Sequence, residues 1–275
     1  MYTRKNFSLL PLSLLFFFSA GVLGATENPC APPNPTEVVA VAASVAPLSP
    51  ANPLWDDVPS MEITLFEQLV TPPVGGGSTP TIHVQAIHDG EWVSFRLTWL
   101  DDTENDSVGV DTFRDTVAVG FPIDPAVFPS PFMGDATNGV SIWQWTANSQ
   151  ADAEGRGKFD EMYPSTEGVW YFPQDEDISN LNEEWRGHLP ADAYIAYGFG
   201  TLERSSQEGL TGMGLYAEES WRVVIRNRLD GGMLPLSPEG LSKMIFAVWD
   251  GAENEVNGRK SVTLMWTPFV LSPLS

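Results

Sequence analysis

A stretch of strict alternation constrains the fold of this chain more than any other feature. Within residues 92–99 every second side chain is apolar, at Val93, Phe95, Leu97 and Trp99. A period of two predicts a half-buried β-strand. Residues 81–87 precede it across an Asp89-Gly90 turn, which is typical of a β-hairpin. The chain should therefore build its core from antiparallel strands.

Further short segments have the same character. We expect strands at residues 116–121, 139–145, 221–226, 244–249 and 261–266, whereas helical periodicity is weak throughout. Residues 146–212 are polar and rich in Gly, Asp and Glu, which predicts long excursions from the sheets with short helices. The pattern favours an all-β, sandwich-like fold with long loops. We expect one domain at residues 54–275, after an extended lead-in at residues 26–53.

The N-terminus has the layout of a secretory signal. Arg4 and Lys5 precede an apolar run at residues 7–23, and the small residues Gly24 and Ala25 follow. We expect a signal peptide at residues 1–25 and an exported, periplasmic protein. Once the signal is cleaved, no stable membrane span is expected. A retained N-terminal anchor is the alternative.

Charge and cysteine content exclude several classes of protein. The chain has 14 Lys and Arg against 36 Asp and Glu, a net charge of −22, which is incompatible with neutralising nucleic-acid phosphates. Its single Cys excludes a disulfide framework, a multi-Cys zinc site and an in-chain iron–sulfur cluster. It also excludes the C-x-x-C-H attachment of a c-type haem.

Hydrolytic chemistry has little support in the sequence. There are three His and neither a G-x-S-x-G nor an H-E-x-x-H motif. A glycosidase stays open because two carboxylates need no local signature. Residues 101–106 are acidic but lack the ligand spacing of an EF-hand, so a solvated loop is the favoured interpretation.

Two residues stand in contexts that suit metal ligation. Met133 lies in a turn-like stretch just ahead of an aromatic strand, where its thioether is available. Lys260 opens a predicted strand after a Gly-containing turn. Each residue by itself is also compatible with an ordinary role, Met133 as core filler and Lys260 as a solvated cation.

An ordered set of segments resembles the haem-binding gamma subunit of the ethylbenzene dehydrogenase family, which accompanies periplasmic molybdenum oxidoreductases. The matching segments include Leu54-Trp55-Asp56 and Gly198-Phe199-Gly200-Thr201-Leu202. The others are residues 95–99 with Asp101 and Asp102, 115–122, 132–145, 221–226, 246–251 and 260–266. The set extends over nearly all of the chain that follows the expected signal.

The resemblance implies a β-sandwich that holds one b-type haem through axial Met and Lys ligands. Met133 and Lys260 match the two family positions, and Lys243 is the competing lysine. Without Cys-x-x-Cys-His the haem would be non-covalent. Candidate wall residues for the haem are Phe132, Trp143, Trp145 and Trp249. Candidate partners for its propionates are Arg222, Arg226 and Arg259.

The resemblance also implies a non-catalytic electron-transfer role. The chain would pass electrons between the iron–sulfur subunit of a molybdenum-containing complex and a soluble cytochrome, while the catalytic subunit would be a partner chain. A family member that works without the molybdenum subunits is one alternative. The other is a carbohydrate-binding β-sandwich module without haem, which would not need the Met133 and Lys260 pair.

Overall fold

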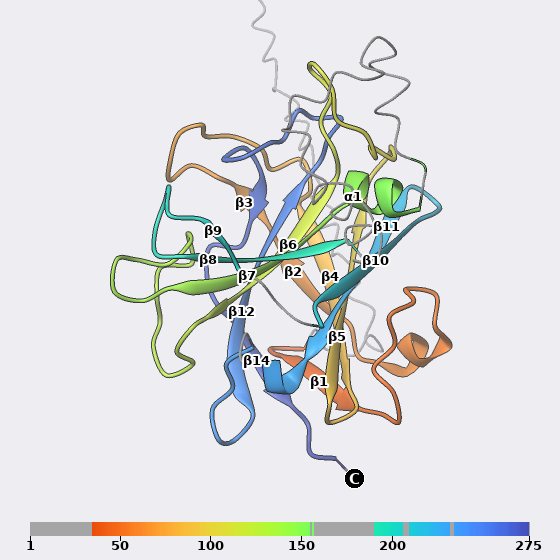
Figure 1. Cartoon of the computed structure of the whole chain (residues 1–275), viewed down its shortest axis with the longest axis vertical. Helices are drawn as coiled ribbons and strands as arrows, with labels where there is room; N and C mark the ends of the chain where they lie inside the picture. Colours follow the sequence, from red (N-terminus) through yellow and green to blue (C-terminus); the bar gives the residue numbers. More distant parts are fainter. Residues whose placement is uncertain (1–34, 155, 157–189, 206–208, 232–233, 275) are drawn as a thin grey trace, which may run out of the picture. The chain divides into compact units, whose positions relative to one another are not determined.

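The computed structural model describes residues 35–154, 156, 190–205, 209–231 and 234–274 (Figure 1). The expected signal peptide and residues 157–189 of the polar segment lie outside these ranges. Among the helices of the described chain, none is long and apolar enough to cross a membrane.

The strands form one long mixed sheet. Its order is β10 (Thr211–Tyr216), β11 (Ser220–Arg228), β5 (Trp92–Leu100), β4 (Thr81–His88), β1 (Val38–Ala42), β14 (Thr267–Leu271), β12 (Leu241–Trp249), β6 (Thr116–Pro122), β7 (Val140–Thr146), β8 (Ala191–Ala196) and β9 (Glu203–Ser205). Off this path, β2 (Met61–Thr64) pairs with β4, and β13 (Ser261–Val262) pairs with β12 and with β3 (Phe66–Glu67). Strand β1 runs parallel to both neighbours, and the other pairings are antiparallel.

The two halves of this path face each other across an aromatic core (Figure 1). The ring of Phe95 on β5 lies 5.8 Å from that of Phe121 on β6, between ring centroids. The rings of Trp145 on β7 and Trp221 on β11 are 5.0 Å apart, edge to face. Such contacts join side chains from two sheet faces, as in a β-sandwich. The prediction of an all-β, sandwich-like fold is confirmed.

The predicted strands are found with small shifts in their ends, except the last one. The predicted strand at 261–266 is wrong beyond Val262, because the chain leaves the sheet and re-enters it as β14. Part of the expected extended lead-in at 26–53 pairs with the sheet. It contains β1, which lies between β4 and β14 inside the sheet. Short helical turns do occur, as α1 (Ala147–Ala153), η1 (Pro53–Asp57) and η2 (Leu229–Gly231).

The acidic segment after β5 begins as a buried structure, not as a solvated loop. Asp101 and Asp115 are buried, and their carboxylate oxygens lie within 4.8 Å of one another and of Asp250. Asp115 accepts hydrogen bonds from the backbone amide of Gly251 and from the Trp221 indole, each at 2.9 Å. Burial, reinforced by the Asp101 charge, raises the pKa of Asp115 to about 7. Burial also raises the pKa of Asp101 to about 6.

These raised pKa values predict a pH dependence of stability. The folded state binds more protons than the unfolded state between about pH 4 and pH 7, so the free energy of unfolding should fall as pH rises through that interval. Asp101→Asn removes one charge of the cluster. Urea unfolding at a series of pH values should then show a flatter slope, and stability at pH 8 should rise by about 2 kcal/mol.

A matched control is Asp102→Asn, because Asp102 is the exposed neighbouring carboxyl. It should change the pH slope only slightly, because the Asp102 charge is the smallest of the causes that raise the Asp101 pKa. An Asp101→Asn protein that keeps the full slope of the native protein would contradict this account of the cluster.

Candidate functional site: an apolar cavity on the outer face of the sheet

A cavity of about 850 Å³ lies on the face of β6, β7 and β12 that points away from the aromatic core. Its floor is the row Thr116, Ala118 and Gly120 on β6. These residues are small, and a Cβ added at Gly120 would lie only 2.8 Å from the Ile245 side chain. Larger side chains border this row: Ile142, Gln144, Ile245, Trp249 and, on β8, Tyr194. Strand alternation thus produces a trough in the centre of the sheet.

Loops cover part of the trough. They contribute Gln68 and the Pro72-Pro73 pair, Phe132 and Met133, Phe199, and residues 255–258. The lining is predominantly apolar, and its volume falls within the range of about 300–1,000 Å³ that is common for cofactor and small-molecule sites.

Met133 is held in place by its backbone. Its φ of 66° lies in the left-handed region, which is uncommon for a residue other than glycine. The Gly198 amide donates a 2.8 Å hydrogen bond to the Met133 carbonyl, and Gly134, also left-handed, donates to Ser130. The Asp135 carboxylate closes the turn by accepting from the amides of Thr137 and Asn138. The hydrogen bonds of the turn therefore fix the position of the Met133 backbone and the direction in which its side chain begins.

Lys260 is held from the other side of the cavity. Its amide donates to the Gly75 carbonyl at 3.0 Å, and its carbonyl accepts from the Gln68 amide at 3.2 Å. Gly76, with φ of 97°, packs directly on the Lys260 backbone, where a Cβ would come within 2.3 Å of the Lys260 nitrogen. The Lys260 Nζ lies 4.7 Å from the centre of the Trp249 ring. Burial lowers the pKa of Lys260 to about 8, which eases formation of the neutral amine.

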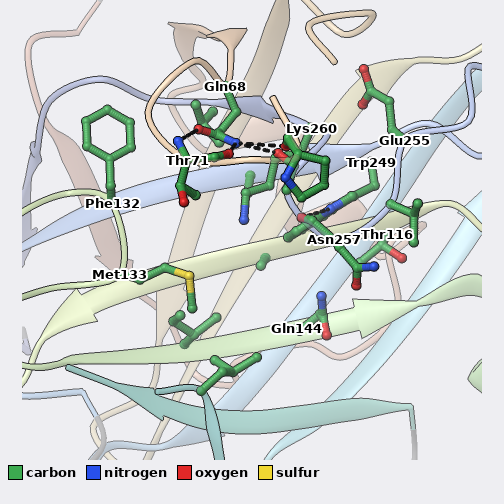
Figure 2. Close-up of a pocket in the computed structure, with 18 of the residues that line it drawn as sticks. Gln68, Thr71, Thr116, Phe132, Met133, Gln144, Trp249, Glu255, Asn257 and Lys260 are labelled. Atoms are coloured by element: carbon green, nitrogen blue, oxygen red, sulfur yellow. Dashed lines mark hydrogen bonds between the residues drawn. The ribbon is translucent and has the colours of Figure 1, made fainter. Parts of the chain in front are cut away.

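Figure 2 shows both side chains directed into the cavity, Met133 from the loop before β7 and Lys260 from the turn before β13. A thioether is a soft neutral donor, and an amine is a strong donor once it is deprotonated. The pair suits an iron or copper centre better than a hard cation such as Ca²⁺, which takes oxygen ligands. The trough between them is broad, apolar and floored by small residues, so it also suits a flat apolar ring.

Lys243 does not line this cavity. Its Nζ donates to the backbone carbonyls of Pro125 and Val127, at 2.9 and 2.7 Å, and lies over the Phe128 ring. The Trp266 indole donates to the Pro129 carbonyl of the same loop. The structure thus uses Lys243 to anchor the loop that leads to Met133.

Two of the four aromatic residues predicted to line the site do so. Phe132 and Trp249 line the cavity, whereas Trp143 and Trp145 are fully buried in the aromatic core. The reason is the alternation of β7, which turns both tryptophans inward and Ile142 to the cavity.

The predicted anion partners lie elsewhere. Arg226 on β11 stacks on Trp92 and donates to the Ala46 carbonyl, and Arg222 pairs with Glu218. Arg259 is exposed and is not among the lining residues. The arginine that does line the cavity is Arg114, two residues before β6. No sequence motif singles out Arg114, although it is a cation just ahead of a predicted strand.

Fold and cavity together define an all-β protein with a largely apolar cavity that presents one thioether and one amine. The chain belongs to the ethylbenzene dehydrogenase family, whose model matches residues 52–261. The family resemblance stated from the sequence is thereby confirmed.

Three relatives cover most of the chain. The chlorate reductase subunit gamma of Ideonella dechloratans is 28% identical over 239 residues, which span 83% of this chain and 81% of the relative. A chain of Haloferax mediterranei that carries the name of a respiratory nitrate reductase heme subunit is 25% identical, over 88% of this chain and 75% of its own. The dimethylsulfide dehydrogenase subunit gamma of Rhodovulum sulfidophilum is 24% identical, with corresponding shares of 80% and 74%.

Among solved structures, a family 9 carbohydrate-binding module of Caldicellulosiruptor kristjanssonii in complex with glucose is similar. It matches with a TM-score of 0.43 and 9% identity, over 86% of this chain and 96% of its own. At this level the likeness carries no argument about ligand or function.

Proposed function

We propose that this chain is a non-catalytic electron-transfer subunit that binds one b-type haem between Met133 and Lys260. The observation that carries the proposal is the convergence of these two side chains, distant in sequence, on one apolar cavity. The names of the relatives, which are gamma or heme subunits of reductases and a dehydrogenase, support the same role.

Different residues of the site would have different roles in binding the haem. Met133 and Lys260 would supply the axial donors, and the row of Thr116, Ala118 and Gly120 would leave room for a flat ring. Trp249 and the loop over the trough would exclude water. When bound, the haem would supply a one-electron couple, with a potential raised by the thioether. With both axial positions occupied by protein, the site would favour electron transfer over substrate activation.

The proposal extends to the setting of the protein. The N-terminal signal would direct export to the periplasm. There the chain would join a molybdenum-containing catalytic subunit and an iron–sulfur subunit, and would exchange electrons with a soluble cytochrome.

An absorption spectrum of the purified protein, oxidised and then reduced, tests haem binding. We expect a low-spin b-type spectrum with one haem per chain. A protein that stays colourless after incubation with haem, and binds a sugar instead, would overturn the proposal in favour of a carbohydrate-binding module.

The acidic surface predicts a salt-dependent encounter with the cytochrome. With 36 acidic against 14 basic residues, the chain should attract a basic redox partner at long range. In stopped-flow mixing, the bimolecular rate with a basic cytochrome should fall about tenfold or more between low salt and 0.5 M salt. A neutral small-molecule reductant provides the control, because its rate should change little. A bimolecular rate with the cytochrome that does not change with salt would contradict electrostatic steering.

A further inference from the structure

Arg114 lines the cavity and forms no ion pair with the residues that the structure describes. It is half-buried, lies two residues before β6 and lines the cavity. Its Nε is buried and has no hydrogen-bond acceptor, and within the described chain no ion pair involves its guanidinium. A buried donor without an acceptor costs about 1–3 kcal/mol, more when the group is charged.

The arginines elsewhere on this acidic chain make the contrast clear. Several of them form ion pairs with nearby carboxylates: Arg156, Arg204, Arg222 and Arg228. The acidic residue of the lining does not neutralise Arg114 either. The Glu255 carboxylate is used at another place, where it accepts from the amides of Ser78 and Asp250.

Tyr194 on β8 is a second polar residue of the lining. Burial raises the pKa of its hydroxyl, the Asp192 charge adds to that rise, and the Arg204 and Arg114 charges oppose it. Besides Trp249 and Lys260, the lining therefore offers a cation and an aromatic hydroxyl.

We propose that Arg114 is the anion-binding residue of the cavity and takes a carboxylate of the bound ligand. The planar guanidinium fork fits a carboxylate in a bidentate manner, and the buried Nε is one arm of that fork. This inference rests on the proposed function, under which the carboxylate is a haem propionate. It replaces Arg222, Arg226 and Arg259 as propionate partners.

The test compares haem with haem dimethyl ester, in which both propionates are uncharged. Apo-protein is titrated with each ligand, for the native chain and for Arg114→Gln. The native chain should bind haem about tenfold or more tightly than the ester. In Arg114→Gln the affinity for haem should fall by a similar factor, while the affinity for the ester should hardly change. The reduction potential of the haem-loaded variant should also fall, because a positive charge near the iron is lost.

Arg259→Gln and Arg226→Gln are matched controls and should keep the native preference for haem over the ester. If Arg114→Gln also keeps that preference, the assignment of Arg114 is overturned while the haem site stands. If the native chain binds neither ligand, the proposed function fails, and the assignment of Arg114 fails with it.

Discussion

Replacing Lys260 by alanine is expected to convert a low-spin, six-coordinate haem spectrum into a high-spin one and to weaken haem binding about tenfold or more. Loss of an outer-shell partner alone typically costs about 10–100-fold in metal affinity, and Lys260 is proposed as a direct ligand. Met133→Ala should give the same spectral change and, because the thioether favours the ferrous state, a lower reduction potential. Both are measured by absorption spectroscopy and redox titration.

Lys243→Ala and Arg259→Ala are the controls. Arg259 is the exposed neighbour of Lys260, and Lys243 binds loop carbonyls outside the cavity, so both variants should remain six-coordinate. A spectrum that turns high-spin in Lys243→Ala but not in Lys260→Ala would mean that Lys243, and not Lys260, is the iron ligand.

Filling the trough should abolish haem binding without unfolding the protein. Ala118 lies in the middle of the cavity floor, between Gln144 on β7 and Ala247 on β12. A phenylalanine at this position would project into the space where a flat ring would lie. We expect Ala118→Phe to weaken haem binding about 100-fold or more, a difference of about 3 kcal/mol. Haem titration provides the measurement.

Ala118→Ser is the matched variant, since it adds one polar atom and should retain most of the affinity. Circular dichroism and thermal unfolding of the apo-proteins establish that Ala118→Phe is folded. A folded Ala118→Phe protein that binds haem like the native chain would mean that the site is not this cavity.

Much of the fold can be predicted from the sequence, because the alternation of apolar and polar residues indicates which face of a strand is buried. Strand β5 is the clearest case, with its apolar residues in the core as predicted. Strands β8 and β10 escaped prediction. The first lacks alternation, and β10 carries two glycines, Gly212 and Gly214, where Trp145 packs closely. Strand β1 was missed because its neighbours come from distant parts of the chain.

The site was predictable only in part. The positions of Met133 and Lys260 came from family resemblance, since no local pattern joins two residues so far apart. The trough did have a local signal, because residues 116–121 alternate small and large side chains, which leaves one face open. The same alternation could have placed Trp143 and Trp145 on the core face. Arg114 has no local signal beyond its position, because only the three-dimensional structure shows that its Nε has no acceptor among the described residues.

The most direct test of the central claim is iron-edge X-ray absorption of the haem-loaded protein, which reports the atoms bound to iron. The account predicts one sulfur and five nitrogen neighbours in the native chain. The sulfur should be lost in Met133→Ala and retained in Lys260→Ala. An iron shell without sulfur in the native protein, or one that keeps its sulfur in Met133→Ala, would contradict it.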